Sequence, residues 1–212
     1  MISAFAVGAS VTVTATLLLL SAERAGSRRG RMATKPVASL GFLLSAVGAG
    51  ATETLQGRLL FAGLVLSFVG DVLLIAHSEK SFLAGLGSFL LGHAAFAAGF
   101  LARGVSWPVT AGAAFASLAF VVPVWRWLAP HLGPDFRVPV LAYVSVITAM
   151  VALSAGTFAT SRSLPLLVGA VLFAVSDVSV ARDRFVEEAL SNKLWGLPLY
   201  YAAQLLIAYG AA

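Results

Sequence analysis

The stretch LVLSFVGDV at residues 64–72 and the similar stretch AVLFAVSDV at residues 170–178 decide the fold class of this chain. Each contains an aspartate, Asp71 or Asp177, inside an apolar segment of 20 residues. An aspartate at the centre of a membrane helix costs roughly 2.5–3.5 kcal/mol on an insertion scale. The two aspartates are 106 residues apart (177 − 71), which is half of the 212-residue chain. A chain that carries two such residues at matched positions is therefore expected to use them.

The composition is that of a polytopic membrane protein. Hydrophobic residues make up 59% of the chain and charged residues 11%, whereas an average soluble domain is about 25% charged. The apolar segments recur along the whole chain, which predicts an all-α bundle without a soluble domain. The sequence has no cysteine, which excludes disulfides, thiol catalysis and thiolate metal sites. The net charge of +5 is attributed to membrane orientation and anionic lipids, and no nucleic acid partner is expected.

Division of the sequence at charged residues, prolines and glycines predicts eight transmembrane helices in a single domain, residues 1–212. The first is expected to be a retained helix and not a signal peptide. The matched aspartates suggest a direct repeat of four helices, with halves 1–103 and 107–212. The predicted helices are 3–22, 35–51, 57–76, 82–102, 107–127, 137–156, 163–182 and 194–211.

Basic residues predict the orientation of the helices. Eleven of the 14 lysines and arginines fall in or beside the loops that follow the first, third, fifth and seventh helices. By the positive-inside rule these loops face the cytoplasm and both termini face away from it. A bacterial inner membrane location is expected. The eleven residues are Arg24, Arg28, Arg29, Arg31, Lys35, Lys80, Arg126, Arg137, Arg182, Arg184 and Lys193, and the other three are Arg58, Arg103 and Arg162.

Asp71 and Asp177 are each expected five residues before the cytoplasmic end of their helix, about 7.5 Å along the axis. At equal depth they could share one site in the cytoplasmic half. Two carboxyl groups that lie close together cannot easily both ionise, so such a pair would share a proton. Which aspartate would act as the acid and which as the base stays open.

Helical spacing places small, polar and aromatic residues on one face of each of four predicted helices. Small residues beside each aspartate would let neighbouring helices approach closely. The Lys35-Pro36 pair is expected to open the second helix at the membrane surface, where Lys35 could reach lipid phosphates. The faces are Gly63, Ser67, Gly70, Asp71 and Leu74; Gly85, Phe89, Gly92, His93 and Phe96; Gly169, Phe173, Ser176, Asp177 and Val180; and Leu197, Tyr200, Tyr201, Gln204 and Ala208.

Structural roles for these polar residues are the alternative to catalysis. Either aspartate could pair with a neighbouring tyrosine, glutamine or histidine and fix helix packing. His93 could be a packing hydrogen-bond donor, and Gln204 could join two helices. Tyr200 and Tyr201 could be interfacial aromatics.

Metal and cofactor sites are not predicted. The three histidines, His77, His93 and His131, are scattered and have no metal-binding spacing. No nucleophile elbow and no phosphate-binding loop occur. All three lysines fall at predicted helix ends, which argues against a Schiff base in the membrane.

Five stretches together resemble the YhhN family of eight-helix membrane proteins, whose characterised members are lysoplasmalogenases. The resemblance covers most of the chain. It implies cleavage of the vinyl ether of a lysophospholipid without a cofactor, giving a fatty aldehyde and a glycerophospho-base. The stretches are Lys35-Pro36, GLVLSFVGDVLL (63–74), FLLGHAAF (89–96), LFAVSDVSVARDRF (172–185) and YYAAQLLIA (200–208).

The activity that the resemblance implies assigns roles to the polar and aromatic faces. Asp71 and Asp177 would perform acid/base chemistry on the vinyl ether, in chemical analogy to two-carboxylate glycoside hydrolysis. Lys35 would hold the phosphate. The lipid chain would lie among Phe89, Phe96 and Phe173. Residues that position water and the glycerol end would be Ser176, His93, Tyr200, Tyr201 and Gln204.

A proton-coupled transporter or carrier of a lipid or amphiphile is the alternative function, because repeated halves and buried carboxylates also suit alternating access. Neither aspartate-bearing helix is interrupted by proline or paired glycines near the aspartate, which favours the hydrolase. A purely structural membrane protein is a third hypothesis.

Overall fold

The chain folds as a bundle of eight α-helices in the computed structural model, which describes residues 2–76 and 78–212. Within these residues the helices are joined by short turns, and no strand occurs. A 3₁₀ turn, η1, follows α5, and a π-helical turn, η2, follows α7. The α-helices are α1 (Ile2–Arg24), α2 (Arg28–Ala49), α3 (Leu55–Leu73), α4 (Glu79–Arg103), α5 (Trp107–Leu128), α6 (Pro134–Ser161), α7 (Leu164–Ala181) and α8 (Leu190–Gly210); η1 is Ala129–His131 and η2 is Arg182–Val186.

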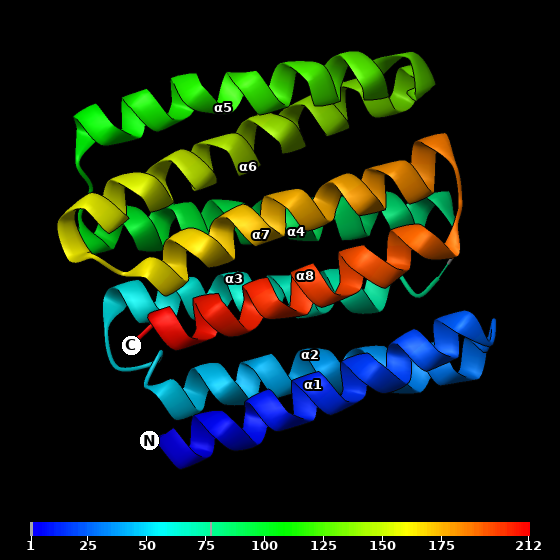
Figure 1. Ribbon diagram of the computed structural model, residues 1–212, viewed down its shortest axis with the longest axis horizontal. Coiled ribbons are helices and arrows are strands. Elements are labelled where there is room, and N and C mark those ends of the chain that lie inside the picture. The colour runs from blue at the N-terminus through cyan, green and yellow to red at the C-terminus, as the bar shows by residue number, and fades with distance from the viewer. Residues whose placement is uncertain (1, 77) are drawn as a thin grey trace.

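The helix pairs α1–α2, α3–α4, α5–α6 and α7–α8 form antiparallel hairpins, as their short connections predict (Figure 1). Helices α4 and α5 are also consecutive but make no extensive contact, and α4 packs on α6 instead. The two termini lie at one end of the bundle, and the turns after α1, α3, α5 and α7 lie at the other (Figure 1). We call the latter the basic end, because the loops there hold most of the lysines and arginines. The α1–α2 and α5–α6 hairpins occupy opposite edges of the bundle (Figure 1).

Seven of the eight α-helices formed by the described residues are long and apolar enough to cross a membrane. The chain is therefore an integral membrane protein, and the all-α prediction is confirmed. Helix α8 is the exception despite its 21 residues. It carries Asn192, Lys193 and Gln204 among its apolar residues, which lowers its hydropathy. The predicted repeat and the sidedness of the termini stay predictions.

Glycines set the spacing between α3 and α4. A Cβ atom added at Gly63 would lie 2.5 Å from the ring of Phe96, and one at Gly70 would lie 2.6 Å from the ring of Phe89. The predicted faces of these two helices therefore meet each other. Helix α7 uses Gly169 in the same way, against Ala203 and Ile207 of α8.

Helix α2 begins at Arg28, and the prediction that Lys35-Pro36 opens it is wrong. Ser27 caps the helix by accepting a hydrogen bond from the backbone N–H of Gly30, which starts it two turns earlier. Pro36 lies inside the helix, as membrane helices tolerate. Lys35 consequently points its side chain into the bundle.

The predicted equal spacing of the aspartates from their helix ends is also wrong. Helix α3 ends at Leu73, two residues after Asp71, because Ser78 caps α4 and the hydroxyl of Ser81 bonds to the carbonyl of Leu73. Helix α7 ends four residues after Asp177, and the chain continues in the π-helical turn. On α7 the buried residue near this end is Ser179, while Val180 of the predicted face is 41% exposed.

Replacement of Gly63 by alanine tests the glycine packing. We expect Gly63→Ala to lower the free energy of unfolding by about 1–3 kcal/mol, because the new methyl group overlaps the ring of Phe96. Unfolding in mixed detergent micelles measures it. The matched control is Gly112→Ala in α5, where a Cβ meets nothing within 4 Å. Equal stability of the two variants would contradict the close approach of α3 and α4.

Candidate functional site

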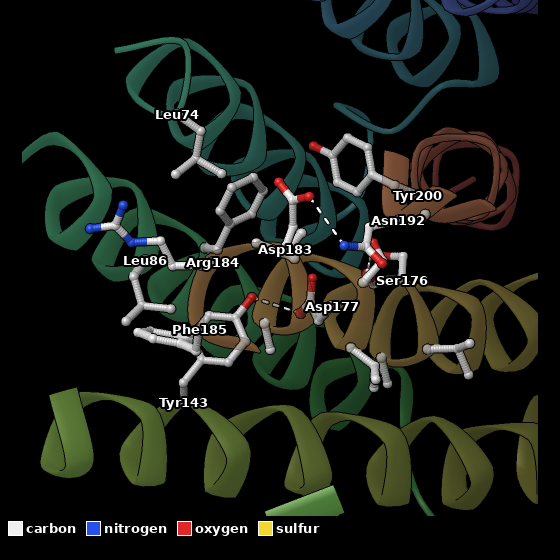
Figure 2. A pocket seen from close by; sticks show the side chains of 18 of the residues that line it. Leu74, Leu86, Tyr143, Ser176, Asp177, Asp183, Arg184, Phe185, Asn192 and Tyr200 are labelled. Carbon is white, nitrogen blue, oxygen red and sulfur yellow. Dashed lines mark hydrogen bonds between the residues drawn. The ribbon is translucent and has the colours of Figure 1, made fainter. Parts of the chain in front are cut away.

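Asp71 and Asp177 line the same cavity, which has a volume of about 700 Å³ and reaches the basic end of the bundle. Figure 2 shows Asp177 and Tyr143 on one side of it, with Asp183, Asn192 and Tyr200 nearby. The volume suits a ligand the size of a lipid headgroup and part of its chain. All eight α-helices of the described residues contribute to the lining, α1 through Glu23 alone and α4 through Phe82, Leu86 and Phe89.

Asp71 is held by three donors from two other helices. Its Oδ2 accepts hydrogen bonds from the Ser39 hydroxyl at 2.6 Å and the Tyr200 hydroxyl at 2.7 Å. Its Oδ1 lies 3.3 Å from the ammonium nitrogen of Lys35. Only 3% of the Asp71 side chain is exposed. A carboxylate buried this deeply needs such a countercharge and such donors, and here it has both.

Asp177 has fewer partners and more exposure. The hydroxyl of Tyr143 on α6 donates to its Oδ2 at 2.7 Å (Figure 2). His93 Nε2 lies 3.7 Å from the same oxygen. The side chain is 18% exposed and faces the cavity. Among the described residues no donor bonds to Oδ1, so this oxygen is available to a ligand.

Aromatic residues form a wall behind Asp177. His93 is fully buried, and its ring lies 4.5 Å from that of Phe173 and 5.2 Å from that of Tyr143. Phe96 and Phe173 are buried in the same cluster and do not line the cavity, whereas Phe89 does. Of the three phenylalanines predicted around the lipid chain, only Phe89 is therefore in reach of a ligand.

The remaining predicted residues from α7 and α8 lie at different distances from the cavity. Tyr200 and Ser176 line it. Tyr201 lies behind Tyr200, with its hydroxyl 3.4 Å from the carbonyl of Lys35. Gln204 is fully buried one turn further along α8, away from the cavity lining. Tyr201 therefore reaches Asp71 only through Ser39, whose hydroxyl lies 3.5 Å from that of Tyr201 and bonds to Asp71, and Gln204 lies behind Tyr200.

Charged residues surround the mouth of the cavity. The ammonium nitrogen of Lys193 lies 3.7 Å from Asp183, 3.9 Å from Glu23 and 3.5 Å from Glu188. Arg31 lies 3.4 Å from Glu23. This mixed cluster joins α1, α2, η2 and α8, and it presents both signs of charge to a ligand.

The η2 turn is ordered by packing as well as by charge. The guanidinium carbon of Arg184 stands 4.6 Å from the centre of the Phe82 ring, which is cation–π geometry. Asp183 accepts hydrogen bonds from the side chain of Asn192 and the backbone N–H of Ala189, both at 3.2 Å. The turn therefore forms a fixed rim beside the mouth.

An apolar limb continues the cavity away from the mouth. We use this name for the part lined by α5, α6 and α7, which meets the polar part at Asp177 and Tyr143. Its residues are aliphatic or aromatic apart from one serine and one threonine. They are Ser117, Phe120, Val121, Val124, Val144, Ile147, Thr148, Val151, Val171, Ala174, Val175 and Val178.

Tyr143 and Ser39 are the site residues that the sequence did not single out. Tyr143 lies nine residues into α6 (143 − 134), deeper than an interfacial tyrosine needs to be. The depth of Tyr143 in its helix was therefore a signal from which the sequence could have identified it as a site residue. Ser39 follows Lys35 by one helical turn and lies on the same face of the predicted helix 35–51, but Lys35 was expected at the membrane surface, so neither residue was predicted to face Asp71.

The structure offers no metal site among residues 2–76 and 78–212, since no three histidine or acidic side chains there converge in ligand geometry. His77, one of the three histidines, lies outside the described residues. His131 bonds to the carbonyl of Trp127 on the exposed surface.

Comparison with known proteins gives consistent matches over most of the chain. The family model described as the YhhN family matches residues 30–211. Relatives named lysoplasmalogenase from Mycobacterium bovis and Mycobacterium tuberculosis are each 35% identical, and the match covers 97% of this chain and 79% of theirs. Human lysoplasmalogenase TMEM86B is 34% identical, over 76% of this chain and 65% of its own. No solved structure matches significantly.

Removal of the Lys35 ammonium tests the Asp71 cluster. We expect Lys35→Met to lower the free energy of unfolding by roughly 2–3 kcal/mol, since it leaves a buried carboxylate without its countercharge. The Lys35→Met/Asp71→Asn double variant should recover at least about 1 kcal/mol relative to the sum of the single changes. Chemical unfolding in mixed micelles measures all three variants. Strict additivity would mean that the ion pair contributes nothing.

Proposed function

We propose that this chain, which belongs to the YhhN family, is a hydrolase that cleaves the vinyl ether of a lysoplasmalogen inside the membrane. The observation that carries the proposal is the position of Asp177, where the charged mouth and the apolar limb of one cavity meet. The relatives named lysoplasmalogenase support the same activity. The proposed substrate is a lysophospholipid with a 1-alkenyl chain, from the surrounding membrane lipids.

The polarity of the cavity matches that of the substrate. The phosphate and amine of the headgroup would lie at the mouth, among Lys193, Arg31 and the neighbouring carboxylates. Lys35, given the phosphate in the sequence-based prediction, is engaged by Asp71, so mouth residues are better candidates for that contact. The vinyl ether, which joins glycerol to the chain, would then come to the level of Asp177. We propose that this end faces the cytoplasm, consistent with its basic loops.

The reaction needs a proton donor, a water molecule and a site for positive charge. A carboxylic acid at Asp177 would protonate the vinyl carbon that is farther from the ether oxygen, giving an oxocarbenium ion. Asp177, now a carboxylate, would take a proton from water as the water oxygen attacks the other vinyl carbon. The hemiacetal would then break its bond to glycerol, giving an aldehyde and a glycerol hydroxyl. The products contain one water more than the substrate.

Asp71 and Tyr143 would assist without being consumed. Because Asp71 is fixed by Lys35, Ser39 and Tyr200, it would provide a stationary negative charge near the developing cation. Tyr143 would orient Asp177 and leave Oδ1 toward the substrate. We assign proton transfer to Asp177 and charge stabilisation to Asp71 because Asp71 has more hydrogen-bond and ionic partners.

The transporter alternative finds less support. Alternating access in known folds relies on interrupted helices at the binding site. Helices α3 and α7, which carry the aspartates, run without an internal proline or break. Among the residues that the structure describes, the charged residues at the cavity mouth all lie at the basic end of the bundle, so the cavity has no second charged mouth at the other end.

Substitution of the aspartates tests the hydrolase. We expect Asp177→Asn to reduce aldehyde release from a 1-alkenyl glycerophosphoethanolamine at least about 100-fold, because the amide cannot donate and recover the proton. Asp71→Asn should lower the rate by a similar factor, and Tyr143→Phe about tenfold. Release is followed with purified protein in detergent by an aldehyde-coupled assay.

The control variant is Asp135→Asn in the exposed first turn of α6, outside the cavity, which should retain full activity. The saturated 1-alkyl analogue should give no aldehyde, since it has no vinyl carbon to protonate. Full activity in Asp177→Asn would exclude the mechanism. A folded wild type that releases no aldehyde would exclude the activity, and proton-dependent uptake of the lipid into proteoliposomes would then favour the carrier.

A further inference from the structure

Helix α5 packs on α6, and the residues of α5 that this packing buries fully lie near its two ends. Near its start, the backbone N–H of Ser106 bonds to the carbonyl of Gly156, and Thr110 packs directly on Gly156 of α6. At its other end, Leu128 is buried against Leu132 and Val140. Thr110 and Leu128 are the buried residues of α5, and every residue between them is partly or fully exposed.

The middle of α5 forms one wall of the apolar limb. Ser117, Val121 and Val124 line the limb from α5, and Val171 and Val175 line it from α7. Helix α5 packs on α6 and has no extensive contact with α7 along the described residues. Phe120 and Val171 both line the limb, yet 49% and 40% of their surfaces are exposed. Because α5 and α7 do not pack on each other, neither helix closes the limb toward the side of the bundle between them.

The limb also has a defined depth. Val151 is eight residues beyond Tyr143 along α6 (151 − 143), which is about 12 Å from the level of Asp177 toward the middle of the membrane. A lipid chain that starts at Asp177 would follow this direction. The charged headgroup of an amphiphile would lie at the polar mouth and its chain in the limb, because burial of a charged group among apolar side chains is unfavourable.

We propose that the limb between α5, α6 and α7 binds the single hydrocarbon chain of an ether lysophospholipid, which enters sideways from the bilayer between α5 and α7. This proposal rests on the proposed function for the identity of the lipid. A lateral opening lets the chain stay in an apolar environment throughout its movement, which avoids exposing it to water. The aromatic wall of Phe96 and Phe173 then has no contact with the chain.

Photolabelling tests the chain site without turnover. The probe is a 1-alkyl lysophosphoethanolamine that carries a diazirine in the distal half of its chain, and the saturated ether prevents hydrolysis. With the wild-type protein in nanodiscs, we expect mass spectrometry to find label on residues that line the limb from α5 and α6, namely Ser117, Val121, Val124, Val144, Ile147 and Val151. A tenfold excess of unlabelled lysolipid should suppress this label.

Other labelling patterns would overturn the proposal. Label that is confined to the outward residues Phe115 and Leu118 and resists competition would mean annular lipid only. Label on Phe96 or Phe173 would mean that the lipid chain binds at the aromatic wall and not in the limb. Absence of any label would mean that the protein has no binding site for the chain. Because the probe is not cleaved, these results are independent of aldehyde release, so failure of the chain site and failure of the hydrolase are distinguishable.

Neighbouring residues of α5 provide a matched pair of variants. Val121→Trp fills the limb, whereas Val122→Trp adds the same side chain at a position that is 39% exposed and outside the cavity. We expect Val121→Trp to raise KM for a long-chain substrate about tenfold, as displacement of two methylene groups from apolar contact would do. It should have a smaller effect on a short-chain substrate. Val122→Trp should match the wild type, and equal effects of the two variants would contradict the proposal.

Discussion

The need to give each buried carboxylate its donors is the constraint on which the rest of this bundle depends. In the hydrocarbon region water cannot compensate a carboxylate, so protein groups must do so. Asp71 on α3 is held by Lys35 and Ser39 from α2 and by Tyr200 from α8. Asp177 on α7 is held by Tyr143 from α6, with His93 from α4 close by. The two aspartates thus fasten two groups of three helices each, and both groups, together with α5, line the cavity.

The same contacts make the two carboxylates chemically unequal. Asp71 has a countercharge and two hydroxyl donors, and its side chain is almost fully enclosed. Asp177 has one strong donor and an oxygen directed to the cavity. A sequence that looks symmetric around its two aspartates therefore yields an asymmetric site, because the donors come from helices whose own sequences differ. Each aspartate has a tyrosine donor, Tyr200 for Asp71 and Tyr143 for Asp177, but Lys35 has no counterpart beside Asp177 among the described residues.

Periodicity was sufficient to predict that eight helices form, although not where α2 begins or where α3 ends. It also predicted the packed faces of α3 and α4, since glycine and aromatic residues recur there at helical spacing and do meet. Four of the residues that periodicity singled out line one cavity in the structure: Asp71, Asp177, Tyr200 and Ser176. Periodicity could not give the inward position of Lys35, which depends on a helix start set by the Ser27 cap. Nor could it pair Tyr143 with Asp177, because the register between α6 and α7 is fixed by packing that no single helix encodes.

The exposed middle of α5 follows from the same division of tasks. Helices that hold the carboxylates must pack tightly, because small displacements would leave a buried charge without donors. A helix that carries no such group can contribute apolar surface alone, and α5 has neither acidic residue nor histidine between its two anchored ends. Its exposed middle costs little where the surrounding solvent is lipid, since lipid chains are as apolar as the side chains of α5. The bundle can therefore keep a rigid polar site and an accessible apolar wall in one small domain.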